Sequence, residues 1–93
     1  MPVATVGYTS SFTLSAGVST QLAGINPGRT YLLITNNDPA ATIYVSFGAS
    51  ATIGSIPIPP GGSLEVAVGK GQMQSGVWAI AGSGTPVCSY TEA

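Results

Sequence analysis

The chain has 93 residues, of which only two are basic and three are acidic, and its formal net charge at pH 7 is -1. Charged residues make up 5% of the chain and hydrophobic residues 44%, whereas about 25% of the residues are charged in typical soluble domains. This balance excludes intrinsic disorder, which needs low hydrophobicity and high charge. It also argues against a nucleic-acid partner, because no cluster of basic residues is present.

The length and the breaks in the sequence limit the class further. The length predicts one domain, and Gly, Pro and Ser interrupt every apolar run well before the roughly 20 residues that a membrane-spanning helix needs. Residues 1–10 lack the basic and apolar blocks of a signal peptide, so we expect synthesis in a bacterial-type cytoplasm and no membrane partner. A surface of hydroxyl and amide groups is cheaper to dehydrate than an ionic one. The composition therefore favours large contacts with other chains.

The predicted elements are short strands separated by turns. No helical stripe is present, and 13 Gly and 7 Pro residues punctuate the chain. We predict an all-β fold, a small antiparallel β-sandwich or barrel of seven or eight strands, with a jelly roll as one such arrangement. The expected strands are 3–8, 11–14, 18–22, 30–36, 42–47, 63–68, 77–81 and 87–91. Residues 1–23 form an N-terminal arm or the first strands, a candidate clamp, and residues 24–93 form the sandwich domain.

The turns carry specific chemistry. Pro27 followed by Gly28, and Pro60 followed by Gly61, predict type II turns before the fourth and sixth strands. The segment 49–60 is the longest irregular stretch. Because it contains three isoleucines, it is expected to pack on its own sheet or on a neighbouring chain.

The stretch "ITNNDPAATIYVSFG" predicts a hairpin with its loop at residues 37–41. In that register one face forms the domain core, and Trp78 is expected to join it: Tyr31, Leu33, Ile43, Val45, Phe47 and Trp78. The opposite face is also apolar, so either another layer of the same domain or a partner subunit must cover it. The candidate interface residues are Leu32, Ile34, Tyr44, Ile53, Ile56, Val3 and Tyr8.

Catalytic chemistry is sparse. The chain has no histidine, and Asp38, Glu65 and Glu92 lie on separate segments as a turn residue, a polar strand position and a tail residue. Arg29 is interpreted as a solvated strand end, with a carboxylate partner across an interface as the alternative, and Cys88 as a small buried hydrophobe. We therefore predict no enzyme activity, no catalytic residue, no metal site and no cofactor.

Four segments together resemble small virion structural proteins of tailed bacteriophages: "NPGRTYLLITNN", "IYVSFG", "IPPGGSLEV" and "GVWAIAGSGTPVCSYTE". The resemblance covers about three-quarters of the chain, from Gly24 to Ala93, and rests on turns and strands. It implies a β-sandwich of the capsid decoration, or cement, type. It further implies a location on the capsid surface of the virion, a homo-oligomer with a trimer favoured, and the major capsid protein or another virion protein as the partner.

Two other functions remain open. A phage tail, neck, fibre or spike component would use the same kind of domain. A carbohydrate-binding β-sandwich module would use Trp78, Tyr44 and Tyr90 as platforms for sugar rings.

Overall fold

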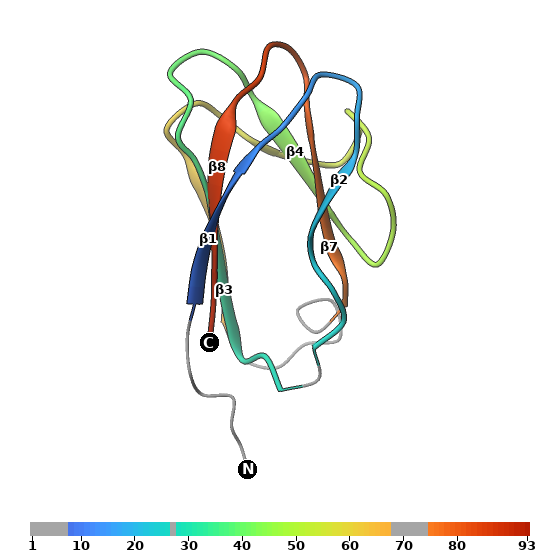
Figure 1. Ribbon diagram of the computed structural model, residues 1–93, viewed down its shortest axis with the longest axis vertical. Helices are drawn as coiled ribbons and strands as arrows, with labels where there is room; N and C mark the ends of the chain where they lie inside the picture. Colours follow the sequence, from blue (N-terminus) through green and yellow to red (C-terminus); the bar gives the residue numbers. More distant parts are fainter. Residues whose placement is uncertain (1–7, 27, 68–74) are drawn as a thin grey trace.

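The computed structural model describes residues 8–26, 28–67 and 75–93, which form two four-stranded antiparallel sheets (Figure 1). The strands are β1 (Tyr8–Thr13), β2 (Thr20–Ala23), β3 (Tyr31–Asn36), β4 (Ile43–Phe47), β5 (Ile56–Ile58), β6 (Ser63–Ala67), β7 (Val77–Ala81) and β8 (Val87–Glu92). Within the described part of the chain, no helix is long and apolar enough to cross a membrane.

The strand order is that of a jelly roll. The first sheet has the order β1-β8-β3-β6 and the second sheet the order β2-β7-β4-β5. The partners are therefore nested: β4 pairs with β5, β3 with β6, β2 with β7 and β1 with β8. The chain thus runs as one long antiparallel ribbon that is wrapped into a sandwich. The prediction of a small all-β sandwich, with the jelly roll as a candidate arrangement, is confirmed.

Most strands lie close to their predicted positions. The expected strands 30–36, 42–47, 77–81 and 87–91 match β3, β4, β7 and β8 to within one residue at each end, and β6 begins at the predicted Ser63. The expected strand 3–8 falls almost wholly outside the described residues. β5 was missed, because Pro57 interrupts its short apolar run. Residues 8–23 supply β1 and β2, and so contribute one edge strand to each sheet.

The predicted hairpin between β3 and β4 is wrong. β3 pairs with β6 and β8 in the first sheet, whereas β4 pairs with β5 and β7 in the second. The segment between them is a corner that carries the chain from one sheet to the other. An alternating apolar pattern reports which side chains share a face, but it does not report which strand lies alongside.

This error reversed the faces of β3. Leu32 and Ile34 point into the core with no exposed surface, so their assignment to an interface is wrong. Tyr31 and Leu33 are half-buried on the outer face of the first sheet, so their assignment to the core is also wrong. The apolar side of β3 is covered by the second sheet of the same chain.

The predicted core residues of β4 are confirmed. Ile43 and Val45 are fully buried in the core, and Phe47 is partly buried against it. Trp78 is different, because it alternates with the buried Val77 and Ala79 and lies half-buried on the outer face of the second sheet. Its assignment to the core is wrong. The core cluster comprises Leu14, Leu22, Leu32, Ile34, Ile43, Val45, Ile58, Val77, Ala79, Ala81, Cys88 and Tyr90.

Asn36 organises the corner between the sheets. Its side chain is fully buried, and its Nδ2 donates to the carbonyl oxygens of Ala41 at 2.8 Å and Ile58 at 3.0 Å. Its Oδ1 accepts from the Asp38 amide at 3.0 Å. The Asp38 carboxylate in turn accepts from the amides of Ala40 and Ala41. One asparagine thereby satisfies backbone groups that leave both sheets.

The predicted turn at Pro60 and Gly61 is present. The Gly62 amide donates to the Pro59 carbonyl at 2.8 Å, and Gly61 has a φ of 75°, as position three of a type II turn requires. The Gly61 amide also donates to the Asn36 carbonyl at 3.0 Å. This turn therefore supports the Asn36 corner as well as reversing the chain.

Candidate interaction surfaces

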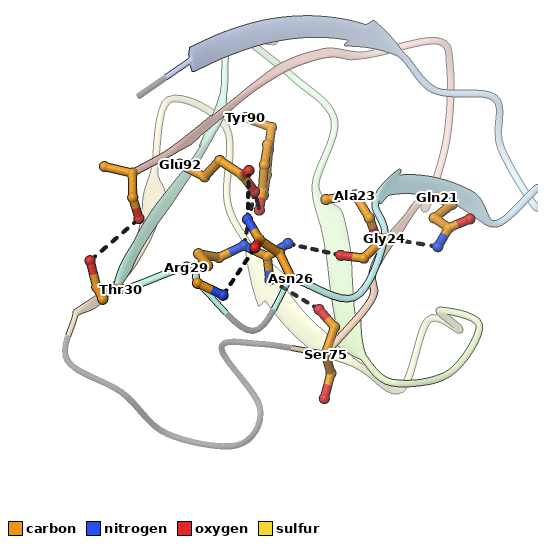
Figure 2. A network of polar contacts seen from close by, with 11 residues as sticks. Gln21, Ala23, Gly24, Asn26, Arg29, Thr30, Ser75, Tyr90 and Glu92 are labelled. Carbon is orange, nitrogen blue, oxygen red and sulfur yellow. Dashed lines mark hydrogen bonds and ion pairs between the residues drawn. The ribbon is translucent and has the colours of Figure 1, made fainter. Parts of the chain in front are cut away.

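Arg29 lies at the centre of a polar network (Figure 2) just before β3 begins, whereas the Asn36 corner lies where β3 ends. Its side chain is 1% exposed, and its Nε donates to Glu92 Oε1 at 2.9 Å. Its terminal nitrogens donate to the carbonyl oxygens of Ser75 at 3.0 Å and Gly24 at 2.9 Å. The guanidinium carbon also lies 5.9 Å from the centre of the Tyr90 ring.

The Glu92 carboxylate is satisfied from several sides. Besides Arg29, it accepts from the Tyr90 hydroxyl at 2.8 Å and from Asn26 Nδ2 at 3.1 Å. The interpretations of Arg29 as a solvated strand end and of Glu92 as a tail residue are therefore wrong. Because the contacts of this pair fix three chain segments to one another, its role is structural.

The other reactive groups are held in unreactive states. Cys88 is fully buried in the core, and this burial raises the pKa of its thiol to about 11. The thiol therefore stays protonated, and weakly nucleophilic, at neutral pH. Hydrogen bonds from the amides of Ala41 and Ala40 lower the pKa of Asp38. Among the described residues, no group of acidic or cysteine side chains could hold a metal ion.

Most side chains named below on the outer face of the first sheet carry hydroxyl groups. Register places four of them side by side across the sheet, and we call this set the hydroxyl row: Ser11 on β1, Ser89 on β8, Thr35 on β3 and Ser63 on β6. A neighbouring pair, Thr9 and Thr91, is joined by a hydrogen bond of 2.9 Å. Among the described residues of these strands, the charge on this face is Glu65, which accepts from the Tyr31 hydroxyl at 2.8 Å. That carboxylate raises the pKa of Tyr31.

The outer face of the second sheet is more apolar. Tyr44 lies opposite Ile80 in register, and Trp78 lies between Gln21 and Ser46. Trp78 packs over Gly76, since a Cβ at that position would lie 2.7 Å from Trp78 Cζ3. Ile80 is only 7% exposed although it alternates with the core residues of β7.

The loop between β4 and β5, residues 48–55, covers part of this face. The Ala51 amide donates to Ser19 Oγ at 2.9 Å, and Ser19 directly precedes β2. Because β7 separates β4 from β2, the loop must cross the outer side of the sheet to make this contact. Its path toward β2 is visible in Figure 1. Of the two expectations for segment 49–60, packing on its own sheet or on a neighbouring chain, the first is confirmed for Ala51, which is buried.

The tip of this loop presents an apolar side chain to solvent. The Ser55 amide donates to the Thr52 carbonyl at 2.9 Å, and the Thr52 amide donates to Ser55 Oγ at 3.0 Å. These bonds close a turn in which Ile53 is 68% exposed. Ile56, at the start of β5, is 44% exposed. A side chain held outward by an ordered turn loses little conformational freedom when a partner covers it.

The predicted interface residues therefore separate into groups. Tyr44, Ile53 and Ile56 lie on one continuous stretch of chain along the second sheet. Tyr8 begins β1, opposite Glu92, and Val3 lies outside the described residues. Tyr90 is fully buried, so it offers no platform for a sugar ring.

Comparison with known proteins gives no relative on which to base a function. No family model matches the chain, and no curated protein matches it significantly.

Proposed function

We propose that this protein is a virion structural protein of a tailed bacteriophage, which decorates the capsid and stabilises it by bridging neighbouring subunits. The observation that carries the proposal is the low charge of both outer faces, on which Glu65 is the one charged residue that the described strands place. The hydroxyl row lies on one face, and a stretch without any charged residue, from Pro39 to Leu64, forms much of the other. Such faces are removed from water at low cost when they are pressed against another protein.

The second sheet supplies the better capsid-binding surface. Ile53, at the tip of the loop that crosses this sheet, is exposed, and Tyr44 on the outer face is half-buried. Ile56 is also exposed, but register pairs it with the core-facing Val45, so it lies at the edge of the sandwich and not on that outer face. Apolar and aromatic anchors of this kind provide most of the energy in typical protein interfaces. The jelly roll itself supports the proposal only weakly, because this fold occurs in both viral capsid and lectin domains.

Binding to capsids tests the proposal directly. Purified protein added to capsids that lack it should co-sediment at a fixed ratio to the major capsid protein, and should raise the temperature at which the capsids open. A ligand that binds only the assembled state stabilises assembly by mass action. Absence of co-sedimentation at micromolar concentrations would refute the proposal.

Variants locate the surface. Ile53→Asp should weaken capsid binding at least tenfold, because it places a charge in a desolvated contact. Val87→Asp, which alters another exposed apolar residue on β8, is the matched control and should bind normally. A glycan array in which the protein binds a sugar through Trp78, with no affinity for capsids, would favour the carbohydrate-binding alternative.

A further inference from the structure

The four edge strands of the sandwich differ in how they oppose pairing with another chain. β1 and β6 are the edges of the first sheet, and β2 and β5 are the edges of the second. An open edge exposes backbone N–H and C=O groups that can bind a further strand, and proteins block such edges with prolines, bulges or charges. Three of these edges carry such a feature.

Both edges of the second sheet are blocked. In β4 the backbone N–H and C=O groups of the even-numbered residues point toward β7. The bonds from Gly82 N to Thr42 O and from Gly48 N to Gly76 O show this. Ile43 and Val45 therefore face β5, which leaves Pro57 at the free edge without an N–H to donate.

At the other edge, β2 has a register shift between Gln21 and Ala23. The Gln21 side chain donates to the Ala23 carbonyl at 3.3 Å. The bulge and the occupied carbonyl both interrupt the row of groups that an incoming strand would need.

The β6 edge carries a charge at its centre. Glu65 is the middle residue of the five-residue strand Ser63–Ala67. If two copies of β6 paired around a two-fold axis, their Glu65 carboxylates would approach each other. Like charges in that position are destabilising.

β1 has none of these features. Its sequence, YTSSFT, contains no charge and no proline, and its register with β8 is unbroken from Tyr8 to Thr13. In β8 the backbone N–H and C=O groups of the odd-numbered residues point toward β3, as the bonds from Asn37 N to Val87 O and from Ala93 N to Tyr31 O show. Its even-numbered residues therefore bond to β1.

This pattern fixes which groups of β1 are open. Ser10 and Phe12, which lie opposite Tyr90 and Cys88, bond to β8. The backbone N–H and C=O groups of Thr9, Ser11 and Thr13 consequently point to the free edge. Among the described residues, no strand pairs with that edge.

We propose that β1 pairs antiparallel with β1 of a second copy of this chain, about a two-fold axis that passes beside Ser11. Thr9 then lies opposite Thr13 of the second copy, and Ser11 lies opposite its own counterpart. This register keeps the outer faces of both sheets on the same side, and it uses every open group of Thr9, Ser11 and Thr13 in about six hydrogen bonds. The two first sheets become one sheet of eight strands.

An uncharged edge suits pairing of this kind. In a two-fold contact each residue meets its own counterpart, or a residue close to it, so any charge on the strand would be repelled. The hydroxyl row of one copy also continues into that of the next. The inference goes beyond the proposed function, because it concerns how copies contact each other and not what they coat.

The pairing is expected to be weak in solution. Two six-residue strands bury less than the roughly 1,000 Å² of a stable interface. Sedimentation of the purified chain should therefore show a monomer at low micromolar concentration and a dimer that grows in toward the millimolar range. A trimer, or a monomer at all concentrations, would overturn the proposal.

Hydrogen exchange identifies the edge that is used. The amides of Thr9, Ser11 and Thr13 should exchange rapidly when the protein is dilute and at least tenfold more slowly when it is concentrated. The amides of Ser63, Glu65 and Ala67 on β6 should be unaffected. Protection of both sets would indicate head-to-tail pairing of β1 with β6, and protection of neither would show that no edge is used; both results contradict the proposal.

Opposite charges provide a second test that does not depend on the wild-type affinity. Ser11→Lys and Ser11→Glu, on an exposed position of the outer face, should each remain monomeric at concentrations where the wild type dimerises. An equimolar mixture of the two should dimerise more strongly than either alone. Ser63→Lys on β6, which is exposed on the same face, is the matched control and should dimerise like the wild type. Equal loss of dimer in Ser63→Lys would refute the role of β1.

Discussion

The two ends of the sandwich are closed by different chemistry. At one end the neutral side chain of Asn36 is fully buried and is satisfied by backbone groups alone. At the other end the charged side chain of Arg29 is equally buried, and it relies on the carboxylate of Glu92. Both side chains hold together segments that would otherwise separate at the ends of β3.

The difference between the ends lies in the consequence of losing a partner. A buried amide that loses a hydrogen bond leaves a neutral group unsatisfied, whereas a buried guanidinium that loses its carboxylate leaves a full charge in a medium of low polarity. The Arg29 end should therefore be the more sensitive to single substitutions. The following predictions test that order.

Removal of the carboxylate charge should have the largest effect. Glu92→Gln is expected to lower the free energy of unfolding by about 3–5 kcal/mol, because Arg29 would remain buried without its counter-ion. Urea denaturation followed by tryptophan fluorescence measures this. Glu65→Gln, which alters an exposed carboxylate bonded to Tyr31, is the control and should change stability by less than about 1 kcal/mol. Equal losses of stability in Glu92→Gln and Glu65→Gln would contradict the role of Glu92 as the counter-ion that the buried Arg29 requires.

Removal of the corner amide should have a smaller effect. Asn36→Ala is expected to lower the free energy of unfolding by about 3 kcal/mol or somewhat less, because the carbonyls of Ala41 and Ile58 would lose their donor. Asn37→Ala is the neighbouring control, since Asn37 is exposed and bonds only to Ser89 Oγ among the described contacts of its side chain. It should lose no more than about 1 kcal/mol. A larger loss than in Glu92→Gln would reverse the proposed order of the two ends.

A third buried group, Cys88, should make stability depend on alkaline pH. Its pKa is raised from 9.0 to about 11 in the folded chain, so the folded state holds the proton more tightly than the unfolded state. The stability that this thiol contributes is then constant below pH 9 and falls as the pH rises from 9 to 11, by between roughly 2 and 3 kcal/mol in total. The difference in the free energy of unfolding between the wild type and Cys88→Ala, measured by denaturation at each pH, should decrease by this amount between pH 9 and pH 11. A difference that stays constant from pH 9 to pH 11 would show that burial does not raise the pKa of the Cys88 thiol.

The turn beside the Asn36 corner should contribute least. Gly61→Ala is expected to lower the free energy of unfolding by about 1 kcal/mol, because an alanine is strained at a φ of 75° although nothing lies within 4 Å of the added carbon. Gly24→Ala, which also meets no neighbour and has no positive φ, is the control and should be neutral or slightly stabilising. The same loss of stability in Gly61→Ala and Gly24→Ala would show that the positive φ of Gly61 is not the cause.

The fold could be predicted from local patterns to a useful extent. The turn at Pro60 and Gly61 and the alternation in β4 both depend on neighbouring residues, and both are found as expected. The pairing of β3 could not be predicted, because a sheet-to-sheet corner and a hairpin loop share the same Asn, Asp and Pro signals. The corner differs only in the burial of Asn36.

The polar network around Arg29 and the open edge of β1 could not be predicted from local sequence patterns. Arg29 and Glu92 are 63 positions apart in the chain, and nothing near either residue indicates that they meet. The free edge of β1 is defined by the strand order, which the sequence does not state. Ile53 and Ile56, which the isoleucine-rich loop marked as interface candidates, are exposed, and their contact with a partner stays a prediction.

The nested pairing of the strands also constrains the order in which the chain can fold. β4 and β5 are near neighbours in the chain, whereas Thr9 on β1 and Thr91 on β8 are separated by 82 positions. β8 lies between β1 and β3 in the first sheet, so that sheet stays divided until the last strand of the chain has been synthesised. Folding should therefore begin at β4 and β5 and close at β1 and β8, with the slow rate that is typical of proteins dominated by distant contacts.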